Sequence, residues 1–167
     1  MEKVDILKRT DIFFDLTQTQ LEMLASICEE RGARLGDILF EENAPGSEMY
    51  IIARGAVEIL LDPSFVGGSG AGQRSPSPVT ITTLRAGQTF GEIALVDQGL
   101  RTASARCAET DTQLLMVRRD KFMQLCDTYP ELGYRVMRNI AADLAFKIRG
   151  SDLAIREQLL WRPRANG

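Results

Sequence analysis

The sequence predicts an α+β fold: an antiparallel β-roll of about eight strands, with a jelly-roll-like layout, flanked by an N-terminal helical segment and by C-terminal helices. Apolar residues recur at helical spacing near both ends of the chain, within residues 21–28 and 137–148. Between these segments, residues 34–119 consist of short apolar runs separated by glycine, proline and asparagine. Such runs are typical of short strands joined by tight connections.

The first helix is predicted to begin near residue 18. Leu21, Leu24 and Cys28 lie at positions i, i+3 and i+7, which places them on one face of a helix. Thr17 and Gln20 have the spacing of a capping box, in which each side chain accepts a hydrogen bond from the other residue's backbone N–H. We therefore expect an amphipathic helix that packs on the core.

Residues 34–61 are predicted to form the first strands, divided by Gly36, a turn at 43–46 and Gly55. The β-branched run 79–84 and the run 112–119 are the clearest later strands.

Residues 62–78 contain four glycines, four serines and three prolines among seventeen residues, a composition typical of a flexible segment. The segment could link two domains. We interpret it as an enlarged hairpin loop, because neither flank alone has enough strands to close a sheet.

The chain is expected to become helical again after Arg119. Pro130 suits the first turn of a helix, and an apolar stripe then ends near Gly150; its members are Met137, Ile140, Ala141, Leu144 and Ile148. A second apolar segment covers 152–161. We therefore predict one domain over residues 1–150, followed by a helical tail at 151–167.

Composition excludes several classes of function. The net charge of −3 argues against a nucleic acid as the main partner, and no apolar run approaches the roughly 20 residues that a membrane span needs. The chain has no histidine, which removes Ser-His and Cys-His nucleophile pairs and the common zinc sites. We expect a cytoplasmic, non-enzymatic protein without a metal, whose three cysteines are reduced.

The stretch "FGEIALVDQGLRTASA", residues 90–105, carries the most specific chemistry. Gly91 permits a close backbone approach, and the residues after it suit one helical turn whose first N–H groups are unpaired and form an anion site. Arg101 adds a planar cation that matches phosphate oxygens. Glu92 would repel phosphate and would instead accept a hydrogen bond from a sugar hydroxyl, so the pair indicates a small nucleotide.

This stretch resembles the phosphate-binding cassette of the cyclic nucleotide-binding domains, and the similarity extends over roughly residues 5–150. The resemblance implies that Glu92 binds the ribose 2'-hydroxyl and Arg101 the cyclic phosphate, with Thr102 helping to hold it. It also implies that backbone amides around Ala94 and Leu95 complete the phosphate site. The residues expected to contact cAMP or cGMP are Gly91, Glu92, Ile93, Ala94, Leu95, Arg101, Thr102 and Ala103.

Other interpretations remain at this point. Glu92 and Arg101 could form a structural ion pair with each other, and Thr102 could simply favour a strand. The chain could also be a degenerate β-roll that serves as a ligand-free dimerisation or docking module. An enzyme on a similar roll is disfavoured, because cupin metal sites depend on histidines.

The partners are expected to be a cyclic nucleotide and, through the C-terminal helices, a second copy of the chain or a protein effector. Only nineteen residues follow Ile148, so we expect no helix-turn-helix segment and no DNA binding. Gly150 and Ser151 could form a hinge or simply end a helix. We expect residues 151–161 to act as a lid over the purine, with Trp161 as its reporter.

Overall fold

The computed structural model describes residues 2–62 and 77–160. Most of the predicted loop 62–78 lies outside the described residues, as does Trp161, the expected reporter of the lid. The helices are α1 (Lys3–Lys8), the 3₁₀ turn η1 (Asp11–Phe13), α2 (Gln18–Ile27), α3 (Ile93–Val96), α4 (Arg119–Thr128) and α5 (Pro130–Leu160). The strands are β1 (Cys28–Ala33), β2 (Ile38–Phe40), β3 (Glu48–Arg54), β4 (Ala56–Leu61), β5 (Val79–Arg85), β6 (Thr89–Phe90), β7 (Ser104–Cys107) and β8 (Thr112–Arg118).

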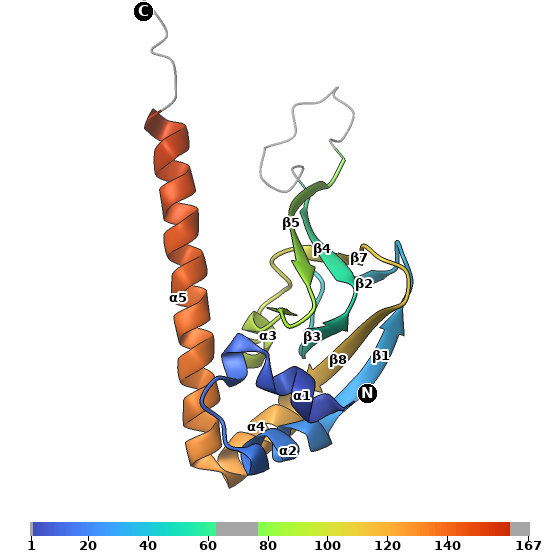
Figure 1. The fold of residues 1–167 in the computed structure, drawn as a ribbon. Coiled ribbons are helices and arrows are strands. Elements are labelled where there is room, and N and C mark those ends of the chain that lie inside the picture. Colours follow the sequence, from blue (N-terminus) through green and yellow to red (C-terminus); the bar gives the residue numbers. More distant parts are fainter. Residues whose placement is uncertain (1, 63–76, 161–167) are drawn as a thin grey trace, which may run out of the picture.

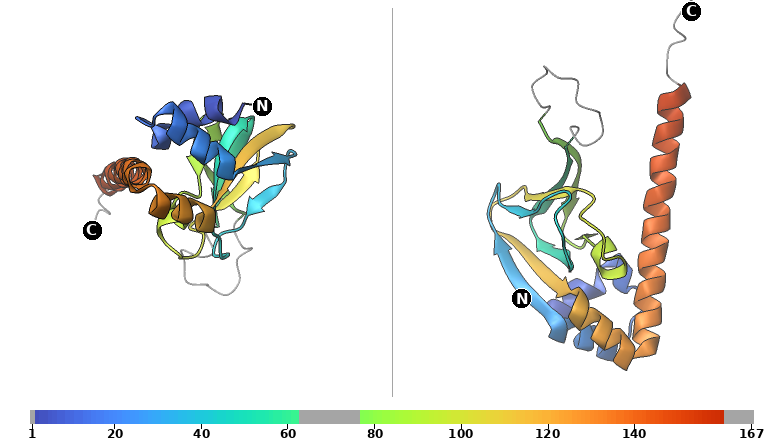
Figure 2. Two further views of the ribbon diagram at one scale, coloured as in Figure 1. Left: turned by 90° about the horizontal axis from the view of Figure 1, so that it is seen from below. Right: turned by 180° about the vertical axis from the view of Figure 1, so that it is seen from behind.

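The eight strands form two antiparallel sheets, in the orders β1-β8-β3-β6 and β2-β7-β4-β5. The sheets make up a roll, α1, α2 and α4 close one end of it, and α5 runs along the side that carries α3 (Figure 1). The C-terminal half of α5 extends past α3, as the view from behind also shows (Figure 2). The predicted fold class, an antiparallel β-roll flanked by helices, is confirmed.

The two central strands of the first sheet, β8 and β3, are buried on both faces. In β8, Leu114 packs in the core between the two sheets, whereas Leu115 and Val117 pack in the core that the helices cover. This alternation is the period of two expected for a strand. In the helix-covered core these strands meet Leu95 of α3 and Ile140 of α5, so that core joins the roll to both helices.

The beginning of α2 is confirmed by its capping box. The Thr17 hydroxyl accepts a hydrogen bond from the Gln20 backbone N–H at 3.3 Å, and the Gln20 side chain accepts one from the Thr17 N–H at 3.0 Å. Its end was predicted wrongly, because Cys28 belongs to β1 and not to the helix. Every residue of β1 pairs with β8, so tertiary pairing sets the conformation of this polar strand.

The helix α5 differs from the prediction, since it continues through Gly150 to Leu160. Gly150 has neither the positive φ of a helix-ending glycine nor a contact that would hold a bend. A single glycine disfavours a helix by only about 1 kcal/mol relative to alanine, too little to end it alone. The expected break at residues 150–151 is therefore absent from the structure.

Two glycines of α5 provide a matched test of this continuity. A Cβ on Gly150 would meet no atom within 4 Å, so Gly150→Ala should stabilise the local helix by about 0.8–1.0 kcal/mol. A Cβ on Gly133 would lie 2.8 Å from Cys126 Cβ, so Gly133→Ala should destabilise the junction of α4 and α5. Hydrogen exchange of residues 146–155 would measure the effect of Gly150→Ala, and thermal unfolding followed by circular dichroism would measure that of Gly133→Ala. Faster exchange in Gly150→Ala would contradict a continuous helix.

Candidate functional site

A cavity of about 1260 Å³ lies between α3, the β4–β5 pair and α5. It is lined by seven of the eight residues predicted for the site: Gly91, Glu92, Ile93, Ala94, Arg101, Thr102 and Ala103. Leu95 does not line it, because the Leu95 side chain is fully buried in the helix-covered core. The structure therefore brings the predicted residues together and gives Leu95 a packing role.

The turn after β6 depends on Gly91, whose φ of 73° is in the left-handed region. A Cβ at Gly91 would also lie 2.8 Å from Arg101 Nη1. The short helix α3 follows, with its backbone N–H groups already engaged at two positions: Ala94 donates to the Gly91 carbonyl and Leu95 to the Glu92 carbonyl. These two amides are therefore not among the unpaired N–H groups expected at the start of the turn, and their part in a phosphate site stays a prediction.

Arg101 is almost completely buried, with 6% of its surface exposed. Its Nη1 donates to the Glu48 carbonyl at 2.9 Å, and its Nη2 pairs with Glu48 Oε2 at 3.0 Å. The guanidinium also lies 4.1 Å from the centroid of the Phe40 ring. These contacts hold a cation beside the cavity in a single orientation, because a buried guanidinium stays charged and needs compensation.

Glu92 is also buried, with 5% of its surface exposed, and its partner lies on α5. Lys147 Nζ donates to Glu92 Oε1 at 2.5 Å and lies 2.8 Å from Asp143 Oδ2, so a single lysine joins the roll to the helix. Burial lowers the pKa of Lys147, but the hydrogen bonds and charges of Asp143 and Glu92 outweigh that effect and hold this pKa above its ordinary value. Glu92 and Arg101 thus have different partners and do not form the structural ion pair with each other that the sequence left open.

The rest of the cavity wall is largely apolar. Its apolar side chains come from β4, β5, the segment around α3, and α5: Ile59, Leu61, Ile81, Leu84, Val96, Leu100, Leu144 and Ile148. Several of them are exposed to solvent, including Ile81 at 53% and Ile148 at 62%. A flat, partly apolar group such as a purine would bury this surface.

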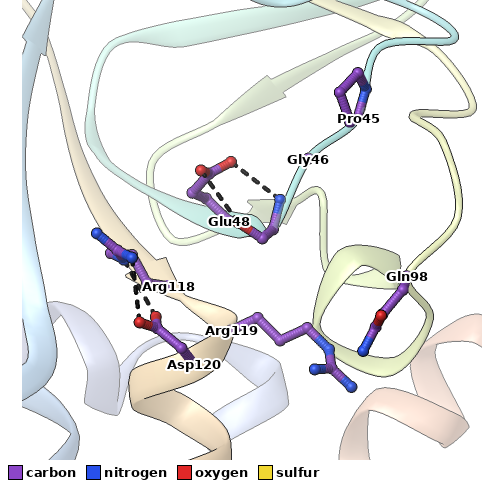
Figure 3. A pocket seen from close by; sticks show the side chains of 8 residues that line it. Pro45, Gly46, Glu48, Gln98, Arg118, Arg119 and Asp120 are labelled. Atoms are coloured by element: carbon purple, nitrogen blue, oxygen red, sulfur yellow. Dashed lines mark hydrogen bonds and ion pairs between the residues drawn. The ribbon is translucent and has the colours of Figure 1, made fainter.

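A second hollow, of about 480 Å³, is lined by residues 45–48, by Gln98 and by residues 118–120 (Figure 3). Its charged side chains include Arg118, which pairs with Asp120 at 3.1 Å, and Glu48, which pairs with Arg101. None of the predicted site residues lines it. The larger cavity beside α3 is therefore the candidate site.

Comparison with known proteins assigns the family. The model of the cyclic nucleotide-binding domain matches residues 30–129, which include the whole of the α3 turn and Arg101. The chain belongs to the cyclic nucleotide-binding domain family. Within the described residues there is neither a helix long and apolar enough to cross a membrane nor a group of side chains suited to a metal ion.

Relatives in this family occur in proteins of different kinds. The chain is 30% identical over 149 residues to the cyclic AMP receptor protein of Thermus thermophilus, covering 89% of this chain and 62% of the relative. It is 30% identical over 135 residues to a cGMP-dependent protein kinase, isozyme 2, of Drosophila melanogaster, covering 80% of this chain but 14% of the kinase. The chain thus corresponds to part of each of these relatives.

Two solved structures share the fold of this family member. The catabolite activator protein of Thermus thermophilus superposes with a TM-score of 0.72 at 29% identity, over 89% of this chain and 63% of the other. A cyclic nucleotide-binding domain from Methylobacillus flagellatus superposes with a TM-score of 0.76 at 25% identity, over 94% and 82%.

Three residues that contact the charged groups of this cyclic nucleotide-binding domain were not expected from the sequence. Phe40 and Glu48 contact Arg101 from the segment around the β2–β3 connection, and Lys147 contacts Glu92 from α5. The spacing of Asp143 and Lys147 at i, i+4 was a usable signal for an ion pair on one helix face. No comparable pattern marks Phe40 or Glu48, because their contacts join segments more than fifty residues apart.

Substitution of Gly46 tests whether the Arg101 guanidinium needs the space that a side chain at position 46 would fill. A Cβ at Gly46 would lie 2.1 Å from Arg101 Nε, so Gly46→Ala should displace the guanidinium and destabilise the fold by about 1–3 kcal/mol. A Cβ at Gly32 would make only an ordinary 3.8 Å contact, so Gly32→Ala is the control and should be close to neutral. Urea unfolding would measure both, and equal effects would contradict a specific role for Gly46.

Proposed function

We propose that this chain is a non-enzymatic sensor module that binds a cyclic purine nucleotide, cAMP or cGMP, in the cavity beside α3. One observation carries the proposal: a buried cation, Arg101, and a buried carboxylate, Glu92, line one largely apolar cavity. These are the groups needed for a phosphate, a ribose hydroxyl and a purine. The membership of the chain in the cyclic nucleotide-binding domain family supports the same ligand class.

The phosphate is assigned to Arg101. A guanidinium has five N–H donors, and Glu48 accepts from two of the nitrogens. Further N–H groups can therefore serve a phosphate without loss of the contacts to Glu48. Thr102 and Ala103 line the cavity next to Arg101 and complete this part of the proposed site, with the Thr102 hydroxyl as a donor.

The ribose is assigned to Glu92. Lys147 binds Oε1 of the carboxylate, so a 2'-hydroxyl can donate to Oε2 without displacing the lysine. The ligand, Glu92, Lys147 and α5 would then form one continuous chain of contacts. Binding of the ribose becomes a means of changing how α5 sits on the roll.

The purine is assigned to the apolar wall formed by β4, β5 and α5. Leu144 and Ile148 of α5 face it across the cavity from Ile81 and Leu84. Thr102 is the candidate for distinguishing the bases, since a threonine hydroxyl can contact the guanine amino group. We favour cAMP narrowly. Titration of cAMP and cGMP against the wild type and Thr102→Ala decides which base the site prefers and whether Thr102 sets that preference.

We further propose that α5 transmits the signal to a second copy of the chain or to a protein effector. The cavity, at about 1260 Å³, exceeds the usual 300–1,000 Å³ of ligand pockets, which leaves room for α5 to close onto the base. On α5, Phe146 is 73% exposed and Leu153 62% exposed, so the helix also presents apolar surface for a partner. Residues 151–161 would form the outer part of this lid.

A ligand-free docking module is the second candidate, and a specific observation favours it. Both charged groups already have partners within the chain, Arg101 with Glu48 and Glu92 with Lys147, so the cavity is electrostatically satisfied without a nucleotide. Calorimetric titration with cAMP and cGMP separates the two candidates. No saturable binding at micromolar ligand would support the docking module and reject the sensor.

Arg101 should dominate the affinity. Arg101→Ala removes a charge-assisted contact to the phosphate, a loss of about 2–5 kcal/mol in binding. Arg101→Lys should be nearly as damaging, because an ammonium cannot make the paired, planar contacts of a guanidinium. Arg106→Ala is the control: this arginine pairs with Glu58 on the roll, and its loss should leave affinity within about twofold. Equal affinity of the wild type and Arg101→Ala would contradict the phosphate assignment.

Glu92 should affect only ligands that carry a 2'-hydroxyl. Glu92→Ala should weaken cAMP strongly but 2'-deoxy-cAMP only slightly, because the deoxy compound has no hydroxyl to donate. In the wild type, cAMP should slow amide exchange in residues 140–150 of α5 more than 2'-deoxy-cAMP does at equal saturation. The role of Glu92 would be wrong if the mutant lost affinity for both nucleotides equally.

A further inference from the structure

We propose that Phe40 is a positioning residue for Arg101: its aromatic ring holds the guanidinium in the orientation that receives the phosphate, and so contributes to ligand affinity. This inference rests on the proposed function. Phe40 lies at the end of β2, sixty-one residues before Arg101, and the expectations from the sequence assign it no part in the site.

An aromatic ring and a glycine both lie close to the Arg101 guanidinium. The Phe40 ring centroid lies 4.1 Å from Cζ, well within the range of a cation–π contact. On Gly46, a Cβ would lie 2.1 Å from Nε, 2.4 Å from Cζ and 2.6 Å from Nη2, so only a residue without a side chain fits there. The aromatic ring and the glycine backbone thus both limit where the guanidinium can lie.

Glu48 accepts hydrogen bonds from the edge of the same guanidinium but does not use all of its N–H donors. Its carbonyl and carboxylate oxygens accept from Nη1 and Nη2, while Nε is buried and has no hydrogen-bond partner among the described residues. A ring that stacks on a guanidinium compensates positive charge through its negative face and uses none of the in-plane N–H groups. Phe40 therefore stabilises the cation while leaving donors for an oxyanion.

The ring of Phe40 is itself held in place. Its centroid lies 5.8 Å from that of Phe90 and 6.1 Å from that of Tyr50, and these two rings stack on each other at 5.1 Å. Phe40 belongs to one sheet, whereas Tyr50 and Phe90 belong to the other, so the three rings join the two sheets beneath Arg101. Phe90 directly precedes Gly91 and Glu92 in the sequence, so the aromatic cluster that supports Arg101 also adjoins the turn that carries Glu92.

The quadrupole of the ring can be changed without a change in its size. Successive fluorination of Phe40, ending with pentafluorophenylalanine, reverses the charge on the ring face but keeps the packing nearly constant. Calorimetric titration with cAMP, and with cGMP in parallel, should show affinity falling in steps to about five- to tenfold below the wild type. Phe40→Tyr should stay within about twofold of the wild type, and Phe40→Leu should match the fully fluorinated protein. The same series at Phe122, a residue of the helix-covered core that does not line the cavity, is the control and should leave affinity unchanged.

A second measurement does not depend on the ligand. In the free protein, the Arg101 Nε–H signal should show a ring-current shift that Phe40→Tyr retains and Phe40→Leu removes. If the wild type binds no cyclic nucleotide, the proposed function fails, and nuclear Overhauser contacts between the Arg101 side chain and Gly46 in Phe40→Leu decide whether Phe40 positions Arg101. Unchanged affinity across the fluorinated series overturns the inference if the nucleotide binds, and unchanged Arg101–Gly46 contacts in Phe40→Leu overturn it if the nucleotide does not bind.

Discussion

The burial of one positive charge, that of Arg101, constrains the structure around it. A guanidinium cannot give up its proton, so it must be compensated wherever it is placed. The compensation comes from Glu48 and Phe40, at either end of the β2–β3 connection, and the backbone of that connection is tied to the arginine as well. The Asn43 N–H donates to the Arg101 carbonyl at 2.8 Å, and the Arg101 N–H donates to the Ala44 carbonyl at 2.9 Å. The charge and the fold of the connection therefore depend on each other.

The second buried charge, Glu92, connects the roll to α5. Two negative groups share Lys147, one on the roll and one on the helix, so neither Glu92 nor Asp143 is left as an isolated charge. Breaking a buried pair is costly because it leaves the remaining charge uncompensated. Glu92 and Lys147 both line the candidate cavity, so the link between the roll and the helix lies in the cavity wall.

The short helix α3 is held in position by contacts with its neighbours in the structure. Leu95 anchors it in the core beneath the first sheet, and Gly91 permits the sharp turn that leads into it. One face of α3 is therefore core, while Ala94 and Ile93 remain at the cavity. The residue that looked like part of the binding turn in sequence, Leu95, is what holds the turn in place.

The sequence by itself determined the fold class, the start of α2 and seven residues of the cavity, because all of these depend on local signals. Apolar periodicity, the Thr17–Gln20 spacing and the glycine before Glu92 act over a few residues, and so they can be read directly from the chain. Only the tertiary structure decided that Cys28 begins a strand, that α5 continues through Gly150, and which side chains compensate Arg101 and Glu92. Those outcomes depend on partners that are distant in the chain, such as β8 for β1, Glu48 for Arg101 and Lys147 for Glu92. A buried charge requires a partner, but its own sequence neighbourhood does not say which one.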